Sequence, residues 1–314
     1  MGVSDGIQPL QRTGTIVLLV LLVCLSPANA KIVPLDTSFD QPVSSGMGGR
    51  SVLVEELTAT WCPSCAEIDP ELMQVADSHG SRVALIALHP SDGEDAFQPE
   101  AGQHRIDRLM AGNDDLALST PTFVVEGGEP RVGYDAWVEV QKDILDAELR
   151  RQAVTELAFE VKRNGTGYIA TVTHGDTVTN AGQFTFILLQ HEKPMPEGFV
   201  NPGEPTRDRV AVATAECTLV NDTVVTAIGF TTASPGDGCT KGFSVEFEAL
   251  TSWSLVLIHE ATLETVESQG NLPTYGAVEL AFRDRAEQPE SSVLEGGLLV
   301  ACAALAVAGI LRKK

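Results

Sequence analysis

The sequence predicts an α/β unit followed by an antiparallel β-sandwich, both lying between a secretory signal and a C-terminal membrane helix. Between residues 51 and 152, apolar strand-like runs alternate with helix-like segments, which is typical of an α/β layer architecture. From about residue 154, short β-branched runs follow one another without a helical period, separated by turn residues. Each end of the chain carries an apolar stretch with targeting character.

Chain length and net charge limit the number of domains and the functional classes to which the protein can belong. A chain of 314 residues has a natural division into two domains. The formal net charge is −22, with 21 Lys and Arg against 43 Asp and Glu. Because phosphate binding needs clustered Lys and Arg, this balance argues against a nucleic-acid partner. An apolar content of 43% is that of a globular protein.

The N-terminal 30 residues have the pattern of a signal peptide. Arg12 precedes an apolar run over residues 15–25, and Ala28-Asn-Ala30 forms an A-x-A cleavage pattern. The run is too short to span a membrane comfortably. We therefore expect a secretory signal over residues 1–30, with an uncleaved anchor as the alternative.

The C-terminus predicts a single membrane span. Residues 296–311 are apolar and residues 312–314 are basic, while residues 284–295 form a polar stalk. Such a helix covers roughly 24 Å, slightly less than a hydrocarbon core of about 30 Å. Val293 and Leu294 can lengthen it, and the basic tail should stay cytoplasmic. The expected location is the cell membrane, with the main part extracytoplasmic; a buried C-terminal helix or a removed sorting tail are the alternatives.

The α/β unit is expected over residues 51–152, after a linker rich in Pro, Ser and Gly at 31–50. Its order is β-α-β-α-β-β-α, with two parallel strands first and a hairpin last. Pro70 predicts a kink or a restart in the first helix. The expected strands are 51–57, 82–88, 122–125 and 131–134, and the expected helices are 66–78, 104–111 and 135–152.

Residues 153–283 are expected to form the second domain. Eight short strands at this spacing favour a sandwich of immunoglobulin-like type, whose strand order the pattern does not predict. The runs are 154–161, 168–174, 184–190, 210–219, 224–231, 243–247, 255–259 and 277–282.

Cys62 and Cys65 stand where a predicted strand meets a predicted helix. Their three-residue offset on a first helical turn lets the two sulfurs meet. The helix N-terminus favours a thiolate and so lowers the pKa of the first cysteine. Cys62 is therefore the candidate nucleophile and Cys65 the candidate resolving thiol. Pro63 suits a helix start, where a missing N–H costs nothing.

Two motifs carry a family resemblance. Thr58-Ala-Thr-Trp-Cys-Pro-Ser-Cys65 follows an apolar strand and resembles the active site of the thioredoxin superfamily. Ser119-Thr-Pro-Thr-Phe123 is similar to the superfamily's cis-proline loop. The resemblance covers roughly residues 50–151 and implies a thioredoxin-like fold there.

The resemblance implies roles for further residues. Pro121 would be cis and lie against the cysteine pair, while the Thr120 backbone would offer hydrogen bonds to a substrate chain. Glu56 stands six residues before Cys62, where many members place a buried acid that accepts the proton of the resolving cysteine. The substrate-binding surface would comprise Trp61, Pro63, Ser64, Thr120 and Pro121.

Several alternatives remain open at the sequence level. Strand alternation sends Glu55 and Glu56 to opposite sides, so the proton-acceptor role fails if Glu55 faces the cysteines. The cysteine pair could also be half of a zinc site or a permanent structural disulfide. His259 and Glu260 begin a zinc-protease motif, but Leu263 stands where the second histidine belongs, and we expect no metal site.

The other cysteines divide by location. Cys24 lies in the predicted signal and Cys302 in the predicted span. Cys217 and Cys239 remain and predict a structural disulfide in an oxidising compartment. Closing this 22-residue interval would stabilise the fold by roughly 3 kcal/mol on the chain-entropy model.

These observations predict a membrane-anchored extracytoplasmic thiol–disulfide oxidoreductase. Its only redox group would be the Cys62–Cys65 pair, without a separate cofactor. Its expected partners are client proteins with thiols or disulfides, a redox partner protein, and the membrane through the C-terminal helix. The alternative is a cell-surface binding or adhesion protein that uses the sandwich, with a redox-inactive thioredoxin fold as scaffold.

Overall fold

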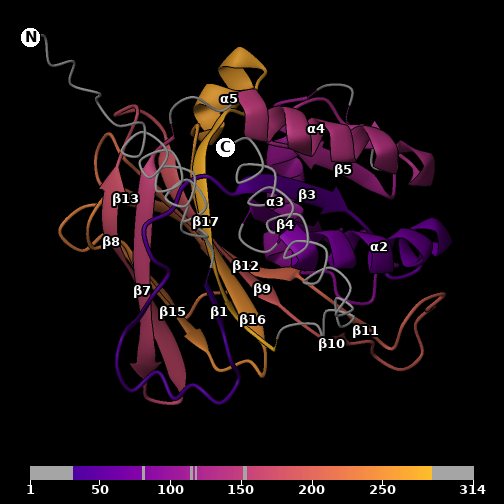
Figure 1. Ribbon diagram of the computed structural model, residues 1–314, viewed down its shortest axis with the longest axis horizontal. Helices are drawn as coiled ribbons and strands as arrows, with labels where there is room; N and C mark the ends of the chain where they lie inside the picture. The colour runs from indigo at the N-terminus through magenta and orange to yellow at the C-terminus, as the bar shows by residue number, and fades with distance from the viewer. Residues whose placement is uncertain (1–30, 80–81, 114–115, 117–118, 151–153, 285–314) are drawn as a thin grey trace, which may run out of the picture.

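The computed structural model describes residues 31–79, 82–113, 116, 119–150 and 154–284 (Figure 1). The fold mixes helices and strands and is mostly sheet. Among these residues no helix is both long and apolar enough to cross a membrane. The predicted signal peptide, the membrane span 296–311, the tail 312–314 and the stalk beyond Asp284 lie outside the described residues.

A ten-stranded sheet runs through the molecule from one side to the other (Figure 1). Nine strands lie side by side, and the tenth, β13 (Thr223–Ile228), pairs with β12. The order is β1 (Lys31–Val33), β17 (Thr274–Phe282), β16 (Trp253–Glu260), β9 (Gln183–Gln190), β12 (Val210–Thr218), β4 (Val83–Leu88), β3 (Val52–Leu57), β5 (Thr122–Val125) and β6 (Arg131–Val132).

The first unit has the element order and strand directions that the sequence predicts. Strand β3 is parallel to β4 and antiparallel to β5, and β5 pairs with β6 as a hairpin. The helices are α2 (Pro63–His79), α3 (Glu100–Ala111) and α4 (Trp137–Arg150), with a 3₁₀ turn, η2 (Tyr134–Ala136), before α4. Helix α2 continues through Pro70 as one element.

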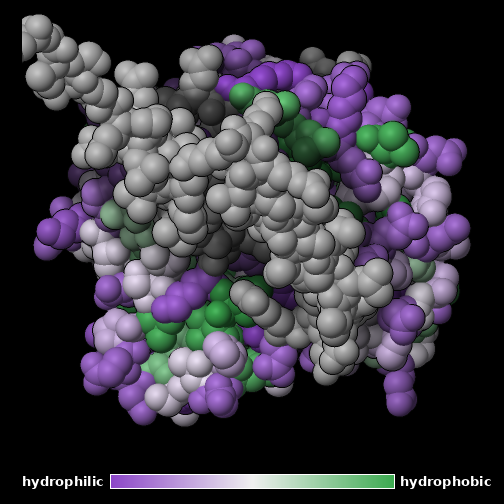
Figure 2. Space-filling view, in the orientation of Figure 1, coloured by the Kyte–Doolittle hydropathy of each residue, from purple (hydrophilic) through white to green (hydrophobic). Residues whose placement is uncertain are grey.

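Alternation along β3 explains how the helices cover both faces of the sheet. Val52 and Val54 face the apolar sides of α2 and α4, whereas Leu53 and Leu57 face α3. Figure 2 shows a largely hydrophilic surface with some hydrophobic side chains over α4. The exposed apolar residues of α4 are Val138, Leu145 and Leu149.

The second region is built from two facing sheets. A five-stranded sheet in the order β14 (Thr232–Ser234), β15 (Ser244–Glu248), β8 (Gly167–Asp176), β7 (Glu156–Asn164) and β2 (Val43–Ser44) packs on strands of the large sheet. Their shared core is rich in aromatic side chains, including Phe159, Phe186, Phe243 and Trp253. Burying each of them stabilises the fold by roughly 2–3 kcal/mol.

Strand β16 shows why this region contains continuous apolar runs. Leu255 and Leu257 point into the core between the two sheets, while Val256 and Ile258 point into the core shared with the first unit. Both faces of the strand are therefore covered, and every residue of β16 is buried.

Residues 31–50 are not the linker that the sequence predicts. Strand β1 pairs with β17 and strand β2 pairs with β7, so this segment belongs to both sheets. Gly49 has a φ of 137°, and a Cβ there would lie 2.0 Å from the carbonyl oxygen of Thr155. Gly49, part of the glycine-rich run that indicated a linker, instead allows a close approach of two backbones.

The two predicted domains form one packed body. Val210 of β12 lies opposite Ala87 of β4, and the Ala87 N–H donates to the carbonyl of Arg209 at 3.0 Å. Strands β9, β12 and β16 share an apolar core with β3, β4 and α3. The predicted boundary near residue 152 therefore separates segments of the chain but does not separate hydrophobic cores.

A buried ion-pair network crosses this junction. Arg105 of α3 donates to Glu55 of β3 and, at 2.7 and 2.8 Å, to both carboxylate oxygens of Glu260 of β16. Burial raises the pKa of Glu260, but Arg105 and Arg108 outweigh it and bring the pKa down to about 2. Removing one partner of such a network costs roughly 3–5 kcal/mol.

The second region also contains a helix that the sequence analysis missed. Helix α5 (Leu263–Gln269) begins after Thr262, whose side chain accepts the N–H of Thr265, and ends at Gly270 in the left-handed conformation. Both cap residues were visible in the sequence. This helix of seven residues, about two turns between two strands, was too short to show a helical period.

Candidate active site

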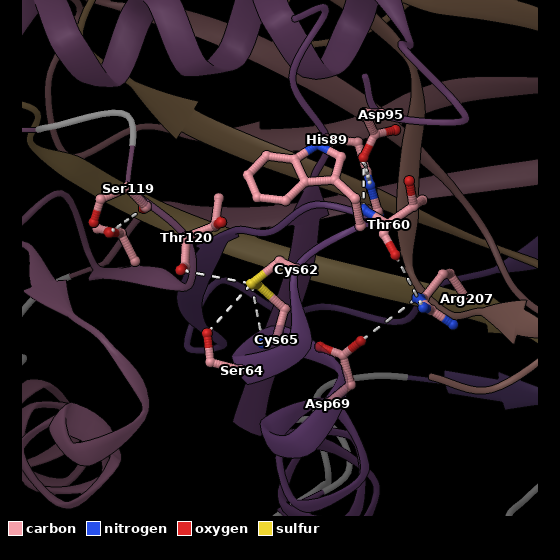
Figure 3. The surroundings of a disulfide bond; sticks show 12 residues. Thr60, Cys62, Ser64, Cys65, Asp69, His89, Asp95, Ser119, Thr120 and Arg207 are labelled. Carbon is pink, nitrogen blue, oxygen red and sulfur yellow. Dashed lines mark hydrogen bonds and ion pairs between the residues drawn. A yellow bond between two sulfur atoms is a disulfide. The ribbon is translucent and has the colours of Figure 1, made fainter. Parts of the chain in front are cut away.

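A disulfide joins Cys62 to Cys65 at the N-terminus of α2 (Figure 3). The Ala66 N–H donates to the Cys62 carbonyl at 3.1 Å, which makes Cys62 the N-cap residue of the helix. Both cysteines are buried, with 3% of Cys62 and 1% of Cys65 exposed. The helix N-terminus thus places its partial positive charge at the Cys62 sulfur.

Three polar groups surround the sulfur of Cys62 (Figure 3). The Cys65 N–H donates to Cys62 Sγ at 3.1 Å, and the Ser64 hydroxyl lies 3.4 Å from it. The carbonyl oxygen of Thr120 lies 3.6 Å from the same sulfur. An N–H and a hydroxyl stabilise a thiolate, and the carbonyl accepts a hydrogen bond when Cys62 is a thiol. After reduction, Cys62 is therefore the sulfur equipped to carry charge.

The Thr120–Pro121 peptide bond is cis, as predicted from the sequence. Pro121 is buried and its carbonyl accepts the N–H of Gly133 at 2.8 Å. The Thr122 hydroxyl donates to the Ser119 carbonyl at 2.6 Å. These contacts hold the loop before β5 so that Thr120 presents its carbonyl to Cys62.

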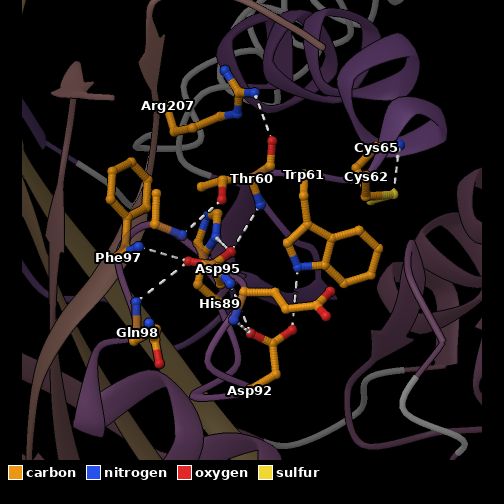
Figure 4. Close-up of polar contacts among 12 residues, drawn as sticks. Thr60, Trp61, Cys62, Cys65, His89, Asp92, Asp95, Phe97, Gln98 and Arg207 are labelled. Atoms are coloured by element: carbon orange, nitrogen blue, oxygen red, sulfur yellow. Dashed lines mark hydrogen bonds and ion pairs between the residues drawn. A yellow bond between two sulfur atoms is a disulfide. The ribbon is translucent and has the colours of Figure 1, made fainter. Parts of the chain in front are cut away.

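The remaining residues predicted for the substrate surface lie around the disulfide. Trp61 is half-buried against Ala59 and the cysteines, and its indole N–H donates to Asp92 at 3.2 Å (Figure 4). Pro63 is exposed as the first residue of α2, and Ser64 is half-buried. This side of the disulfide therefore has side chains that reach solvent.

Glu55 and Glu56 point to opposite sides of β3, and both are buried. Glu55 belongs to the ion-pair network with Arg105. Glu56 is fully buried, and neither of its carboxylate oxygens has a hydrogen-bond donor within the described part of the chain. Of the two acids, Glu56 is thus the one left for chemistry near the helix that carries the cysteines.

Asp69 is a second acid beside Glu56, and the sequence analysis did not single it out. It stands four residues after Cys65, on the same face of α2. Burial, and then the charge of Asp69, raises the pKa of Glu56 well above its usual range. Burial also raises the pKa of Asp69 to about 6, against the opposing charges of Arg207 and His89. Because two carboxylates that share a site repel each other, one of the two tends to stay protonated.

His89 and Asp95 form a buried pair next to Thr60, on the other side of Trp61 from the disulfide (Figure 4). His89 Nδ1 lies 2.8 Å from Asp95, which also accepts the N–H of Thr60 at 2.8 Å. Burial raises the pKa of Asp95, but His89 and backbone donors outweigh this and lower it. The second ring nitrogen, His89 Nε2, has no hydrogen-bond partner in the residues that the structure describes.

Glu56, Asp69 and His89 line a cavity of about 300 Å³. Helix α2 and the ends of β3 and β4 form one side of it. The other side is formed by residues 191–209, which we call the arm: it contains the short strands β10 (Lys193–Pro194) and β11 (Thr206–Arg207). The lining includes Glu56, Asp69, His89 and Arg207.

Sequence reasoning found the cysteines, the Thr-Pro loop and Glu56, and it missed the other charged groups of the cavity. The four-residue offset between Cys65 and Asp69 was a usable signal. Asp95 and Arg207 had none, because each reaches the site from a distant segment. In the described ranges, no cluster of three or more His, Cys, Asp or Glu side chains is placed to hold a metal ion.

The second disulfide lies in different surroundings. Cys217 of β12 bonds to Cys239, and neither has exposed surface. Both belong to the aromatic core between the two sheets. Their pairing is the one that the sequence predicts.

Comparison with known proteins gives a likeness in structure only. No protein-family model matches the chain, and no curated protein matches it in sequence. The structure is similar to HBP35 of Porphyromonas gingivalis, with a TM-score of 0.50, 15% identity, and coverage of 78% of this chain and 79% of that one. It also aligns with AGR_C_4864 from Agrobacterium tumefaciens at a TM-score of 0.48 and 11% identity, over 76% and 97% of the two chains. The likeness to HBP35 is a likeness of fold alone.

Proposed function

We propose that this protein is a thiol–disulfide oxidoreductase that exchanges disulfides with client proteins through Cys62 and Cys65. Residues 51–152 would be its thioredoxin-like unit. The observation that supports this best is the surroundings of Cys62 Sγ: a helix N-terminus, the Cys65 N–H at 3.1 Å and the Thr120 carbonyl at 3.6 Å. No such set of polar groups is needed to hold a permanent disulfide.

The exchange proceeds in two displacement steps. The Cys62 thiolate attacks one sulfur of a client disulfide, forming a mixed disulfide and releasing the other client sulfur as a thiolate. Cys65 then loses its proton, and its thiolate attacks Cys62. The Cys62–Cys65 bond forms and the second client thiolate leaves, so two electrons pass to the client. The reverse steps oxidise a client dithiol, and a redox partner protein resets the pair.

Glu56 is the proposed proton acceptor for Cys65. Its burial without a donor raises its pKa, which brings it toward the pKa of a thiol. Proton transfer is most efficient between groups of similar pKa. In the reverse direction the protonated Glu56 returns the proton to the Cys65 thiolate.

The client chain is proposed to bind over the side of the disulfide that faces Trp61, Pro63 and Ser64. Trp61, Pro63 and Ser64 frame this side, and the loop at Thr120 and Pro121 offers backbone groups to an extended segment. The signal sequence and C-terminal apolar stretch support a membrane-anchored, extracytoplasmic location. The facing sheets of the second region support an immunoglobulin-like sandwich.

One observation favours the alternative function. Only 3% of Cys62 is exposed, which suits a locked disulfide in a scaffold whose sandwich does the binding. Trapping distinguishes the two. In the full chain, Cys65→Ser should accumulate mixed disulfides with client proteins that dithiothreitol releases, because the resolving thiol is gone.

The matched control is the double variant Cys62→Ser, Cys65→Ser, which should trap nothing. If Cys65→Ser traps no more protein than this control, and the wild type neither reduces nor oxidises a model disulfide peptide, the exchange function is wrong and the scaffold function is favoured.

A further inference from the structure

The arm connects the second region to the candidate active site. It follows β9 in the chain and extends along α2 of the first unit (Figure 1). At Gly203 the contact is close: a Cβ there would lie 2.9 Å from the Cβ of Ala66, the residue directly after Cys65. The arm therefore packs against the first turn of the helix that carries the disulfide.

Arg207 is the cation that the arm contributes to the cavity. Its guanidinium donates to the Glu204 carbonyl at 2.6 Å and to Asn201 at 2.7 Å, both within the arm. It also reaches the Thr60 carbonyl at 3.5 Å, and its Nε lies 3.8 Å from Asp69 (Figure 3). Arg207 is only 7% exposed, so its charge is weakly screened. The arm thus holds Arg207 in place facing Asp69.

The other charged groups around the carboxyl pair come from two places, the end of β4 and the arm. His89, directly after β4, lines the cavity, and its Nε2 has no hydrogen-bond partner among the residues described. The arm adds three acids, of which Glu192 and Glu204 are exposed, and Asp208 bonds to His191 at 2.6 Å. Arg207 is consequently the permanent cation among the lining residues of this cavity.

We propose that the second region is a working part of the candidate active site: its arm closes the cavity beside Cys65, and Arg207 keeps Asp69 ionised, so that Glu56 carries the proton of the carboxyl pair. Arg207 is then a positioning residue, which acts through Asp69. The consequence for Cys65 rests on the proposed exchange function, whereas the placement of the proton does not.

The position of the proton can be measured in the oxidised full chain by infrared spectroscopy of protonated carboxyl groups against pH. In the wild type, Asp69 should lose its proton near pH 6. This step is assigned by its disappearance in Asp69→Asn. An opposite charge nearby lowers a carboxyl pKa by about 1–3, so in Arg207→Met the step should move upward by at least about 1. Arg207→Lys, which keeps the charge, should move it less.

Two further variants guard this test. Glu204→Gln removes an exposed acid from the same arm and should leave the step in place. Gly203→Val must push the arm off α2 while keeping Arg207, because even a Cβ at this position lies within 3.0 Å of both Ala66 and Arg207. Gly203→Val should raise the pH at which Asp69 loses its proton, as Arg207→Met does. It replaces Arg207→Met in the test if that variant does not fold.

The proposal is wrong if Asp69 loses its proton at the wild-type pH in both Arg207→Met and Gly203→Val. It is also wrong if Asp69→Asn titrates like the wild type, because no step then belongs to Asp69. The pH profile of mixed-disulfide resolution should shift with the infrared step. A shifted infrared step in a chain without exchange activity would instead contradict the proposed function alone.

Discussion

The two disulfides in the described part of the chain are both buried but differ in what surrounds them. Cys62 caps the N-terminus of a helix and has an N–H, a hydroxyl and a carbonyl close to its sulfur. Cys217 and Cys239 lie among the aromatic and aliphatic side chains of the sandwich core, and the polar atom close to Cys239 Sγ is an acceptor, the Thr218 carbonyl at 3.2 Å. Burial therefore does not distinguish an exchangeable disulfide from a structural one; groups that stabilise the thiolate do.

The lengths of chain that the two disulfides close point the same way. Cys62 and Cys65 are three residues apart, so their bond restricts few conformations of the unfolded chain. Cys217 and Cys239 are 22 apart and join β12 to the segment before β15. The second bond thus contributes more to stability and the first is free to serve chemistry.

The strongest test of the different roles of the two disulfides is to remove one sulfur from the first, Cys62–Cys65. Cys62→Ser should lower the rate of disulfide exchange at least about 1,000-fold, because no other thiolate replaces the nucleophile. The free energy of unfolding should fall by no more than about 2 kcal/mol. Exchange with a model disulfide peptide and urea unfolding measure the two effects. Retention of exchange in this variant would place the nucleophile elsewhere.

The converse change removes the second disulfide. Cys217→Ala with Cys239→Ala should lower the free energy of unfolding by roughly 3 kcal/mol, since a 22-residue loop is released in a tightly packed core. Exchange through Cys62 should stay within about threefold of wild type under conditions where the variant is folded. A large loss of exchange without unfolding would contradict the separation of roles.

Glu56→Gln should separate stability from activity. The folded pKa of Glu56 is raised above its unfolded value near 4.3, so its contribution to stability is full below that pH and is lost as pH rises toward the folded pKa. The variant should consequently be more stable than wild type at pH 8, by roughly 1–3 kcal/mol, and equal to it at pH 4. Resolution by Cys65 should slow about 10- to 100-fold. Equal free energies of unfolding at pH 8 would show that burying the Glu56 carboxyl does not destabilise the fold.

The smallest effect concerns the strand that carries the second disulfide. Glu216 precedes Cys217 on β12 and accepts from His104 of α3 at 3.1 Å, which raises the pKa of His104. A raised histidine pKa gives stability that is full below about 6.5 and lost as pH rises through the folded pKa. Glu216→Gln should remove about 1 kcal/mol of this dependence between pH 6 and 9, measured by urea unfolding. An unchanged dependence would mean that this contact does not link α3 to β12 energetically.

Local patterns predicted most of the first unit. The strands at 52–57, 83–88 and 122–125 and the three helices all follow from apolar runs and their breaks, and the parallel first pair and the final hairpin follow from the element order. The cysteine pair and the Thr-Pro loop were visible as motifs. These features depend on neighbours within a few residues.

The features that the sequence did not reveal depend on distant contacts. Nothing in residues 83–88 indicates that the edge of β4 receives β12, because that pairing joins segments over 100 residues apart. Gly49 lies in a segment whose composition is that of a linker, but its backbone packs closely against Thr155. Arg207 reaches Asp69 only through the arm, so the charge balance of the cavity emerged only from the fold.

Graded reduction of the full chain, followed by alkylation and mass mapping of each cysteine, tests the central claim most directly. The Cys62–Cys65 bond should open at a reduction potential above about −300 mV, and Cys217–Cys239 should stay closed until a lower potential is reached. Cys62 should be alkylated before Cys65. If both disulfides open together, or if Cys217–Cys239 opens first, the two bonds do not have the separate roles proposed for them.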